Sequence, residues 1–505
     1  MKTLKDLLIY SEGNLYGYPR NINVGIRGIA YDSRNVAPGY LFVCIRGEHH
    51  DGHDYILEAA SKGAVAVVID KETDVPDTLG VVRVSNSRKA LGDIARAFYD
   101  DPSSSMFCVG VTGTKGKTTT TYLIKSILDK AEMPCGIIGT LGCISQDTTL
   151  MTKHTTPESS DVQAFLAKMQ RSGDVAVAME VSSHAIKLQR IRGTNFDAKI
   201  FTNIGHDHLD FHGSFSDYLA TKASFFSTPC TQSPGEGDCG RAGISIINAD
   251  DPCSDFILSK INTEALTYGI HNTSSHITAK ELRSHGRGTS FVAYTPNGSF
   301  PVILNLKGVF NVYNALASIG CGLAAGLNQD TIAAGLQSLK KVPGRFELID
   351  EGQPFSVIVD YAHTPDSLKS VLTEARHLGS GNLIVVFGCG GDRDKSKRPV
   401  MGEIAASLAD LVIITSDNPR TENPYEISKE IEEGILYRQL PQLGYKIIID
   451  RNSAIKHAIF SARKNDVLVI AGKGHETYQI FNDGTIHFDD REASKRLLRE
   501  YMNNV

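Results

Sequence analysis

The sequence predicts an α/β protein of three domains, and three observations lead to this prediction. The chain has 505 residues, and domains usually have about 100–200 residues each. Short apolar runs rich in Val and Ile alternate with helix-like stretches through most of the chain. Runs this apolar are typical of strands that are covered on both faces of a parallel sheet. Turn-rich segments divide these runs into groups.

The first hundred residues contain their own strand-like runs, "LFVCIRG", "AVAVVID" and "GVVRVS". The turn-rich segment "YDDPSSSM" then precedes "CVGVT", "VAVAME", "AKIFTNI" and "GISIINA". A Lys/Pro/Gly segment, "SLKKVPGRFELIDEGQPFS", precedes "FSVIVDYA", "NLIVVFGC", "DLVIITS" and "DVLVIAG". We therefore expect boundaries near 105 and 342, which gives domains at 1–105, 106–342 and 343–505, with "SLKKVPGRF" as a hinge.

Charge and composition exclude several classes of protein. The chain has 52 basic and 57 acidic residues, a net charge of −5, and no block of like charges, so we expect no nucleic-acid partner. No run of about 18 apolar residues is present and the N-terminus lacks a signal-peptide pattern, so we expect a cytoplasmic protein without a membrane partner. The nine cysteines contain no CxxC pair, which disfavours a disulfide framework or a zinc site.

The stretch "FCVGVTGTKGKTTTTYLIKSIL" has the layout of a phosphate-binding loop at the start of a helix. Glycines can fold the backbone round an anion, a lysine supplies positive charge, and a threonine hydroxyl can bind Mg²⁺. The pattern G-x-x-x-x-G-K-[ST] is not matched in full, because Val111 stands where the first glycine belongs. A plain turn between strand and helix is the weaker alternative. The predicted nucleotide-binding residues are Thr112, Gly113, Thr114, Lys115, Gly116, Lys117 and Thr118.

Acidic and histidine residues follow two later strand-like runs. Glu180 ends the run "VAVAME", where a carboxylate could bind a metal at the edge of a parallel sheet or simply meet solvent. The segment "TNIGHDHLDFHG" brings three histidines and two aspartates together, which alone would suggest zinc. Lys222 follows Tyr218 at helical spacing and would otherwise pass for a surface lysine.

Further motifs resemble the Mur ligase family, the ATP-dependent amide-forming ligases that build the peptide stem of peptidoglycan. They occur in order from Ser33 to Glu476, so the resemblance covers nearly the whole chain. It implies a small N-terminal α/β unit, a central P-loop ATPase-like parallel sheet and a C-terminal Rossmann-like α/β domain. The motifs are "HTTPES", "MEVSSHA", "TNIGHDHLDFHGSFSDYLATK", "FNVYNALAS", "VPGRFE", "DYAHTPDSL", "FGCGGDRDKSKRP", "DNPRTENP" and "AGKGHE".

The resemblance assigns roles in the central site, with ATP and Mg²⁺ as the cofactors. A carboxylate must be activated before it forms an amide, and ATP achieves this through an acyl phosphate. By resemblance, Asn311, Arg345 and Asp360 also contact the nucleotide. The residues that the resemblance makes catalytic are Lys117, Glu180, His208 and Lys222. The residues that it places on Mg²⁺ are Thr118, Glu180, His208 and a carbamylated Lys222.

The motifs most resemble the family member that adds the third residue to UDP-MurNAc-L-Ala-D-Glu, here meso-diaminopimelate. An arginine of "DNPR" can grip the distal carboxylate of this amino acid, which lysine lacks. The residues that by resemblance contact UDP-MurNAc-L-Ala-D-Glu are Ser33, Thr155, Thr156, Ser182 and Arg190. Those assigned to the amino acid are Arg393, Asp417, Asn418, Pro419, Arg420, Gly472 and Glu476.

Three alternatives remain open at this point. The same ligase could add lysine or ornithine. Folylpolyglutamate synthetase shares the ligase architecture and a similar loop, although the N-terminal unit and "DNPR" count against it. A nucleotide-dependent switch would bind ATP without turnover, since fold does not fix function. We expect the chain to act as a monomer.

Overall fold

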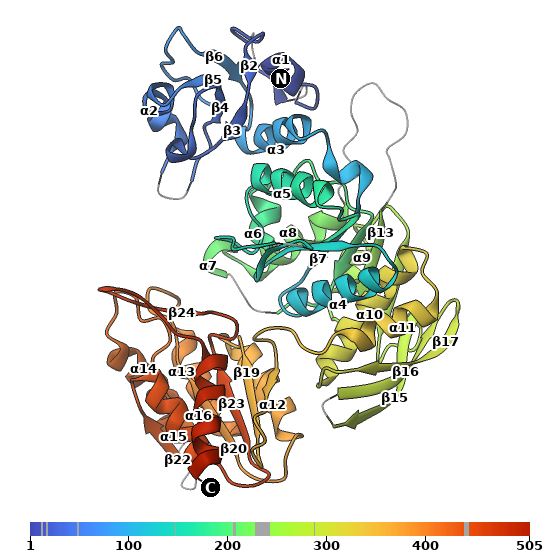
Figure 1. Cartoon of the computed structure of the whole chain (residues 1–505), viewed down its shortest axis with the longest axis vertical. Helices are drawn as coiled ribbons and strands as arrows, with labels where there is room; N and C mark the ends of the chain where they lie inside the picture. Colours follow the sequence, from blue (N-terminus) through green and yellow to red (C-terminus); the bar gives the residue numbers. More distant parts are fainter. Residues whose placement is uncertain are drawn as a thin grey trace.

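The computed structural model forms three lobes that follow one another along the long axis of the molecule (Figure 1). The N-terminal lobe is at one end, the central lobe contains the largest sheet, and the C-terminal lobe is at the other end. The structure describes the whole chain apart from residues 12–13, 17–18, 48–49, 147, 206–208, 228–242, 287, 439–443 and 505.

The N-terminal lobe is built on a four-stranded parallel sheet in the order β3-β4-β5-β6. Apolar clusters cover both faces of this sheet, as its Val- and Ile-rich strands predict. A short antiparallel pair, β1 (Lys2–Thr3) and β2 (Gly25–Ile26), lies beside it. The strands of the sheet are β3 (Gly28–Ala30), β4 (Tyr40–Val43), β5 (Ala64–Ile69) and β6 (Gly80–Arg83). The helices are α1 (Leu4–Leu7), α2 (Ile56–Ser61) and α3 (Ser87–Phe98).

The central lobe contains an eleven-stranded sheet in the order β10-β9-β8-β11-β7-β12-β13-β14-β15-β16-β17. The predicted parallel sheet is confirmed for the middle of this array, from β8 to β15. The strands of this middle part are β7 (Phe107–Thr112), β8 (Cys135–Gly139), β11 (Ala176–Glu180), β12 (Ala198–Phe201), β13 (Ile244–Asn248), β14 (Ala265–Gly269) and β15 (Ile277–His285).

Both edges of the central sheet are antiparallel, which the sequence analysis did not predict. One edge is formed by β9 (Gly142–Ile144) and β10 (Thr149–Leu150). The other edge is formed by β16 (Gly288–Thr295) and β17 (Gly298–Leu304), which follow β15 in a meander. The signal for this meander was present, because Asn297-Gly298 between two apolar-polar alternating runs is typical of a hairpin turn.

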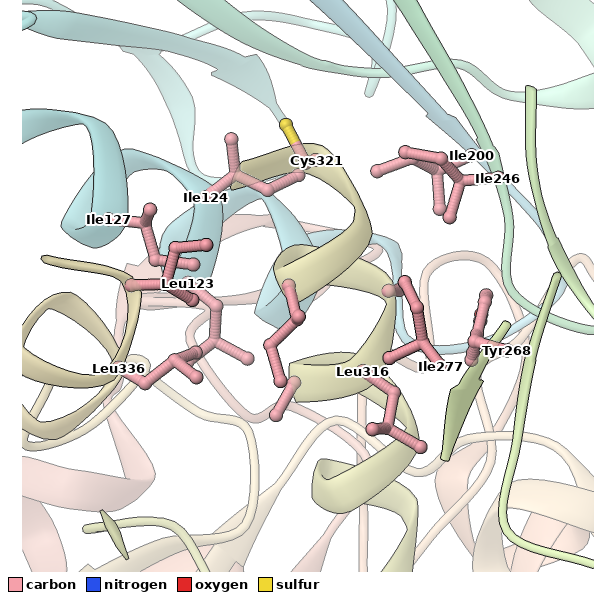
Figure 2. Close-up of a cluster of buried hydrophobic side chains, with 14 of the residues drawn as sticks. Leu123, Ile124, Ile127, Ile200, Ile246, Tyr268, Ile277, Leu316, Cys321 and Leu336 are labelled. Carbon is pink, nitrogen blue, oxygen red and sulfur yellow. The ribbon is translucent and has the colours of Figure 1, made fainter. Parts of the chain in front are cut away.

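Helices cover both faces of the central sheet and bury alternate strand residues. Val109 and Val111 of β7 face a cluster formed with α4 (Lys117–Lys130), α10 (Val309–Ala324) and α11 (Gln329–Ser338). Figure 2 shows Leu123, Ile124 and Ile127 of α4 in this cluster. Cys108 faces the opposite cluster, where β-strand side chains meet the other helices. Those helices are α5 (Ser159–Arg171), α6 (Ser183–Lys187), α8 (Phe215–Ser227) and α9 (Ser254–Leu258), and the short α7 (Leu209–His212) contacts α8.

The C-terminal lobe has a six-stranded sheet in the order β18-β19-β23-β20-β21-β22, parallel except for the edge strand β18. A separate hairpin, β24 (Tyr478–Phe481) and β25 (Gly484–His487), follows the sheet in sequence. The strands are β18 (Glu347–Ile349), β19 (Ser356–Asp360), β20 (Leu383–Phe387), β21 (Leu411–Ile414), β22 (Gly444–Ile447) and β23 (Val467–Ala471). The helices are α12 (Pro365–Arg376), α13 (Lys397–Leu408), α14 (Pro424–Tyr437), α15 (Arg451–Ser461) and α16 (Asp490–Asn504).

The two larger sheets place polar residues at the carboxyl ends of neighbouring parallel strands. In the central sheet, β7 leads into the phosphate loop and β11 ends at Glu180. In the C-terminal sheet, β19 ends at Asp360, β21 leads to Asp417 and β23 leads to Gly472. Ligands of open α/β sheets bind at these ends. Within the described residues, every helix is too short or too polar to cross a bilayer.

Candidate active site

The phosphate loop connects β7 to α4 and depends on two glycines. Gly113 and Gly116 have φ angles of +151° and +85°, a region that favours glycine. A Cβ atom at Gly113 would collide with Thr202 Oγ1, and one at Gly116 would lie 2.5 Å from Asn314 Oδ1. The ammonium of Lys117 donates to the carbonyl oxygens of Gly113 at 2.8 Å and Thr114 at 3.0 Å. The loop thus holds a cation at the N-terminus of a helix, which is a favourable arrangement for phosphate.

Glu180 is buried beside the first turn of α4, with 1% of its surface exposed. Its Oε2 accepts hydrogen bonds from the hydroxyls of Thr118 and Thr140, each at 3.0 Å, and its Oε1 accepts from Thr140 N at 2.8 Å. A carboxylate and a hydroxyl in contact form a set of oxygen donors that suits Mg²⁺. Among the described residues, no group of three His, Cys, Asp or Glu side chains that could bind a metal is found. The predicted ligand His208 lies outside the described residues.

Lys222 of α8 lies against the phosphate loop, as a role in the central site requires. Its side chain is buried, and Nζ donates to Gly113 O at 3.1 Å and to Thr112 Oγ1 at 3.5 Å. The ammonium also lies 4.8 Å from the centre of the Tyr218 ring. The helical spacing from Tyr218 to Lys222 therefore directs both side chains to the same site. Carbamylation of Lys222 stays a prediction.

The segment after β11 and the segment around Thr155 form a polar shelf next to Glu180. Thr156 Oγ1 donates to Glu180 O at 2.7 Å and accepts from Ser182 N at 3.1 Å. Thr155 Oγ1 lies 3.3 Å from Thr140 Oγ1, which itself contacts Glu180. The structure therefore brings the predicted substrate residues Thr155, Thr156 and Ser182 together with Glu180.

Arg190 joins this shelf and also contacts a carboxylate that the sequence analysis did not single out. Its Nη1 donates to Thr156 O at 3.3 Å, and its Nε donates to Glu158 at 3.0 Å. Glu158 also accepts from Arg88 of α3 at 2.9 Å, so this buried carboxylate connects the N-terminal and central lobes. Ser33 lies apart from this group, because its hydroxyl donates to Glu58 at 3.1 Å within the N-terminal lobe.

A cavity of about 510 Å³ lies between the central and C-terminal lobes. The phosphate loop and Glu180 line it from the central lobe, and Arg345, residues 360–364 and the first turns of α12 line it from the C-terminal lobe. Arg345 Nη2 donates to Thr118 Oγ1 at 3.2 Å, and its guanidinium lies 4.7 Å from the centre of the Tyr361 ring. The predicted hinge therefore places Arg345 at the phosphate loop.

Asp360 and two asparagines support the walls of this cavity. The carboxylate of Asp360 accepts from Phe346 N at 2.7 Å and Ala362 N at 2.8 Å, and burial raises its pKa. These bonds fix the backbone next to Arg345. Asn314 lines the cavity and donates to Asn311 Oδ1 at 3.0 Å. Asn311 in turn donates to Lys307 O at 2.7 Å, so it lies behind Asn314 and holds it in place.

A second cluster lies at the ends of β21 and β23 and contacts the cavity through Tyr361. Asn418 Nδ2 donates to Glu476 Oε2 at 2.9 Å, and the buried ammonium of Lys473 donates to the same oxygen at 3.0 Å. The hydroxyl of Tyr361 lies 3.5 Å from the other oxygen, Oε1. Gly472 has a φ of +112°, and a Cβ there would lie 2.6 Å from Asp417 Oδ2. Lys473 was not predicted, although it lies within the "AGKGHE" motif.

Two arginines lie on neighbouring loops on either side of Gly390. A Cβ at Gly390 would lie 3.0 Å from Arg420 Nη1 and 3.9 Å from Arg393 Cγ, so the two side chains lie around one peptide. Arg420 Nη1 donates to Gly391 O at 2.6 Å. Pro419 contacts the same glycine, because a Cβ at Gly391 would collide with Pro419 O. Arg393 is exposed and lines a cavity of about 430 Å³.

The chain is similar to proteins of known name. Two curated proteins named UDP-N-acetylmuramoyl-L-alanyl-D-glutamate--2,6-diaminopimelate ligase are similar over almost their full length. The protein from Bacillus licheniformis is 43% identical over 98% of this chain and 99% of its own. The protein from Bacillus velezensis is 44% identical over 94% of each chain.

Solved structures lead to the same family. A structure with the same ligase name is 30% identical, covers 94% of this chain and 95% of its own, and gives a TM-score of 0.68. A MurF ligase from Thermotoga maritima, solved with ADP, shares the fold at 20% identity with a TM-score of 0.62, over 95% of this chain and 98% of its own.

Three family descriptions match successive parts of the chain. The Mur ligase family catalytic domain matches residues 25–99, the Mur ligase middle domain matches 111–322, and the Mur ligase glutamate ligase domain matches 344–474. Together with the relatives above 40% identity, these matches cover the phosphate loop, the polar shelf and the cluster around Glu476. The chain belongs to the Mur ligase family.

Proposed function

We propose that this protein is an ATP-dependent ligase that joins meso-diaminopimelate to UDP-MurNAc-L-Ala-D-Glu through an acyl phosphate. The observation that carries the proposal is the similarity of the whole chain to relatives that bear this name. The site supports it, because the phosphate loop lines an interlobe cavity and Glu476 borders this cavity through Tyr361.

The central lobe supplies the groups that carboxylate activation requires. A carboxylate oxygen of the nucleotide sugar attacks the γ-phosphorus of ATP, the bond to the β–γ bridging oxygen breaks, and ADP leaves. Lys117 and Arg345 supply positive charge where the phosphates would lie. Mg²⁺ held by Thr118 and Glu180 would neutralise further negative charge. Thr155, Thr156, Ser182 and Arg190 would hold the carboxylate substrate beside it.

The C-terminal lobe supplies the groups that select the amine. Once the amine attacks the acyl carbon, phosphate leaves and takes an oxygen of the former carboxylate with it. Glu476 and Asn418 would bind an ammonium group. Glu476 Oε2 is already bonded to Asn418 and Lys473, so the ammonium would bind at Oε1, the oxygen on the side of Tyr361. Arg393 and Arg420 would bind the distal carboxylate of meso-diaminopimelate. Lysine and ornithine lack this carboxylate and should react poorly.

The hinge has a chemical role in this scheme. Water would hydrolyse the acyl phosphate, so the C-terminal lobe has to cover it while the amine approaches. Arg345 lies at the start of the C-terminal lobe and already contacts Thr118 of the central lobe. The groups that the scheme names all come from one chain, and we propose that the protein works as a monomer in the cytoplasm.

Transfer of an oxygen atom tests the acyl-phosphate step directly. The γ-carboxylate of the D-glutamyl residue is labelled with heavy oxygen, and the phosphate released with meso-diaminopimelate is analysed by mass spectrometry. One labelled oxygen per phosphate is expected in each turnover. Unlabelled phosphate, or phosphate release that does not require the amine and the nucleotide sugar, would overturn the proposal. The latter result would favour a nucleotide-dependent switch.

A further inference from the structure

Arg393 and Arg420 lie on two loops that are bonded directly to each other. We name residues 390–395 the first arginine loop and residues 417–422 the second arginine loop. Gly391 N donates to Asn418 O at 2.9 Å, and Arg420 Nη1 donates to Gly391 O at 2.6 Å. Asp392 Oδ1 accepts from Thr421 Oγ1 at 2.6 Å. The relative position of Arg393 and Arg420 therefore depends on contacts between the loops.

The backbone of these loops is held in an uncommon conformation. Asp392 and Arg420 both have a φ of +54°, in the left-handed region that non-glycine residues seldom occupy. Such residues persist only where the surroundings fix them. Asp392 N donates to Glu422 Oε1 at 2.6 Å, so the strained residue of the first loop is bonded to the end of the second.

Arg398 of α13 lies beneath both loops and contacts each of them. Its side chain is fully buried. Nη2 and Nη1 donate to the two carboxylate oxygens of Glu422, at 2.9 Å and 3.0 Å, and Nη1 also donates to Glu430 at 2.8 Å. Nη2 reaches Gly390 O in the first loop at 3.3 Å. Arg398 lowers the pKa of Glu422 to about 2, which keeps this carboxylate charged in neutral solution.

We propose that Arg398 is a positioning residue for selection of the amino acid, because it fixes the two loops that carry Arg393 and Arg420. This inference rests on the proposed function. Arg398 has no exposed surface with which to contact a substrate. It bonds to the Gly390 peptide that the two other arginines surround, and to the Glu422 carboxylate that bonds to Asp392. A planar guanidinium with several donors suits this task, and a lysine ammonium cannot reproduce it.

Arg451 provides a matched control within the same lobe. It is equally buried and forms a bidentate pair with Asp490 at 2.7 Å for each bond. Its guanidinium donates to Ser416 O at 3.3 Å and Ala471 O at 2.9 Å. These carbonyls precede Asp417 and Gly472, so Arg451 supports the part of the site assigned to the ammonium group. Substitution of either arginine disturbs a buried ion pair, but only Arg398 supports Arg393.

The test compares the effect of Arg398→Lys in two backgrounds, the wild type and a variant with Arg393→Ala and Arg420→Ala. We measure kcat/KM for meso-diaminopimelate, the KM values for ATP and for the nucleotide sugar, and Tm. In the wild-type background we expect a loss of about tenfold in kcat/KM for meso-diaminopimelate and unchanged KM for ATP. In the double-alanine background the same substitution should cost less than about twofold, because the groups that it positions are gone. Arg451→Lys should cost the same factor in both backgrounds.

An equal loss for Arg398→Lys in both backgrounds, or a parallel rise in the KM for ATP, would overturn the inference and leave Arg398 with a general role in folding. If Arg398→Lys does not fold, Glu422→Gln replaces it, since it keeps the shape of the partner and removes its charge; the same pattern is expected. Absence of turnover of meso-diaminopimelate by the wild type would instead contradict the proposed function, so the two failures are distinguishable.

Discussion

Arg345 Nη2 donates a hydrogen bond to Thr118 Oγ1 at 3.2 Å, although the two residues belong to different lobes. Thr118 is the hydroxyl residue of the phosphate loop, and Arg345 is the last cation of the predicted hinge segment. If the C-terminal lobe closes as the proposed reaction requires, one side chain connects this closure with the binding of the nucleotide. In the proposed reaction, this contact brings positive charge to the phosphate that is transferred.

Replacement of Arg345 by Gln should reduce kcat by about 10²-fold or more, because a charge at the transferred phosphate is lost. The effect on the KM for meso-diaminopimelate should be small. Arg376→Gln is a suitable control, since Arg376 forms a half-exposed ion pair with Asp410 on the same lobe. Steady-state ADP release measures both variants. Comparable kcat values for the two variants would contradict this role of Arg345.

Substitution of Lys222 tests whether the phosphate loop requires a positive or a negative charge at this position. Lys222→Ala should abolish turnover, because Nζ contacts Gly113 O and Thr112 Oγ1 in the phosphate loop. If the working form is a carbamate, then acetate or another small carboxylate should restore part of the activity, and methylammonium should not. Activity is measured at increasing concentrations of each ion. Restoration by methylammonium alone would show that the unmodified ammonium is the working form.

Glu476→Gln should raise the KM for meso-diaminopimelate by about tenfold or more and leave the KM for the nucleotide sugar unchanged. The substitution removes the negative charge that would bind an ammonium group, and charge-assisted hydrogen bonds are the stronger ones. It also leaves the buried ammonium of Lys473 without its carboxylate partner. Tm is therefore measured alongside the kinetics, because a fall in stability alone would lower the amount of active enzyme and not the KM.

His475 should make the stability of the C-terminal lobe depend on pH. Burial, with Arg345 nearby, lowers the pKa of His475 to about 3, whereas an unfolded histidine titrates near 6.5. Between these values the unfolded state binds more protons, so this residue lowers stability as the pH falls from about 6.5 to about 3. The Tm of the His475→Gln variant should therefore fall less than the Tm of the wild type when the pH is lowered from about 7.5 to about 5.

The chain contains no tryptophan, so far-UV circular dichroism is the suitable signal for this comparison. Two variants that lose the same number of degrees over this pH range would show that His475 does not contribute. The carboxylates of the lobe titrate in both proteins, and their contribution cancels in the difference.

The parts of the site that the sequence predicts are local in the chain. The phosphate loop follows from seven neighbouring residues, and the position of Glu180 follows from the strand that it ends; Asp360 and Asp417, assigned by resemblance, lie at the end of β19 and after β21. Val109 and Val111 are buried on one face of the central sheet and Cys108 on the other. This alternation also follows from the two-residue repeat of a strand. Each of these features depends only on a short segment and on the rule that the carboxyl ends of parallel strands lie at the same edge of the sheet.

The parts that the sequence did not predict depend on pairing between distant residues. Glu158 is bonded to Arg88 across 70 positions, and Arg398 is bonded to Glu422 across 24. Arginine and glutamate side chains are most often exposed, and only the packing of the lobes shows that Glu158 and Arg398 are buried. The edge hairpin at β16 and β17 is a different case, because its Asn-Gly turn was visible in the sequence.

The central claim is that the protein activates a carboxylate with ATP and then selects meso-diaminopimelate through Arg393 and Arg420. The most direct test is phosphate release from ATP with Mg²⁺ and UDP-MurNAc-L-Ala-D-Glu, with meso-diaminopimelate, lysine or ornithine supplied in turn. We predict turnover that is selective for meso-diaminopimelate. Equal or better turnover with lysine or ornithine would contradict the assignment of the two arginines, and no turnover with any of the three would contradict the proposed reaction.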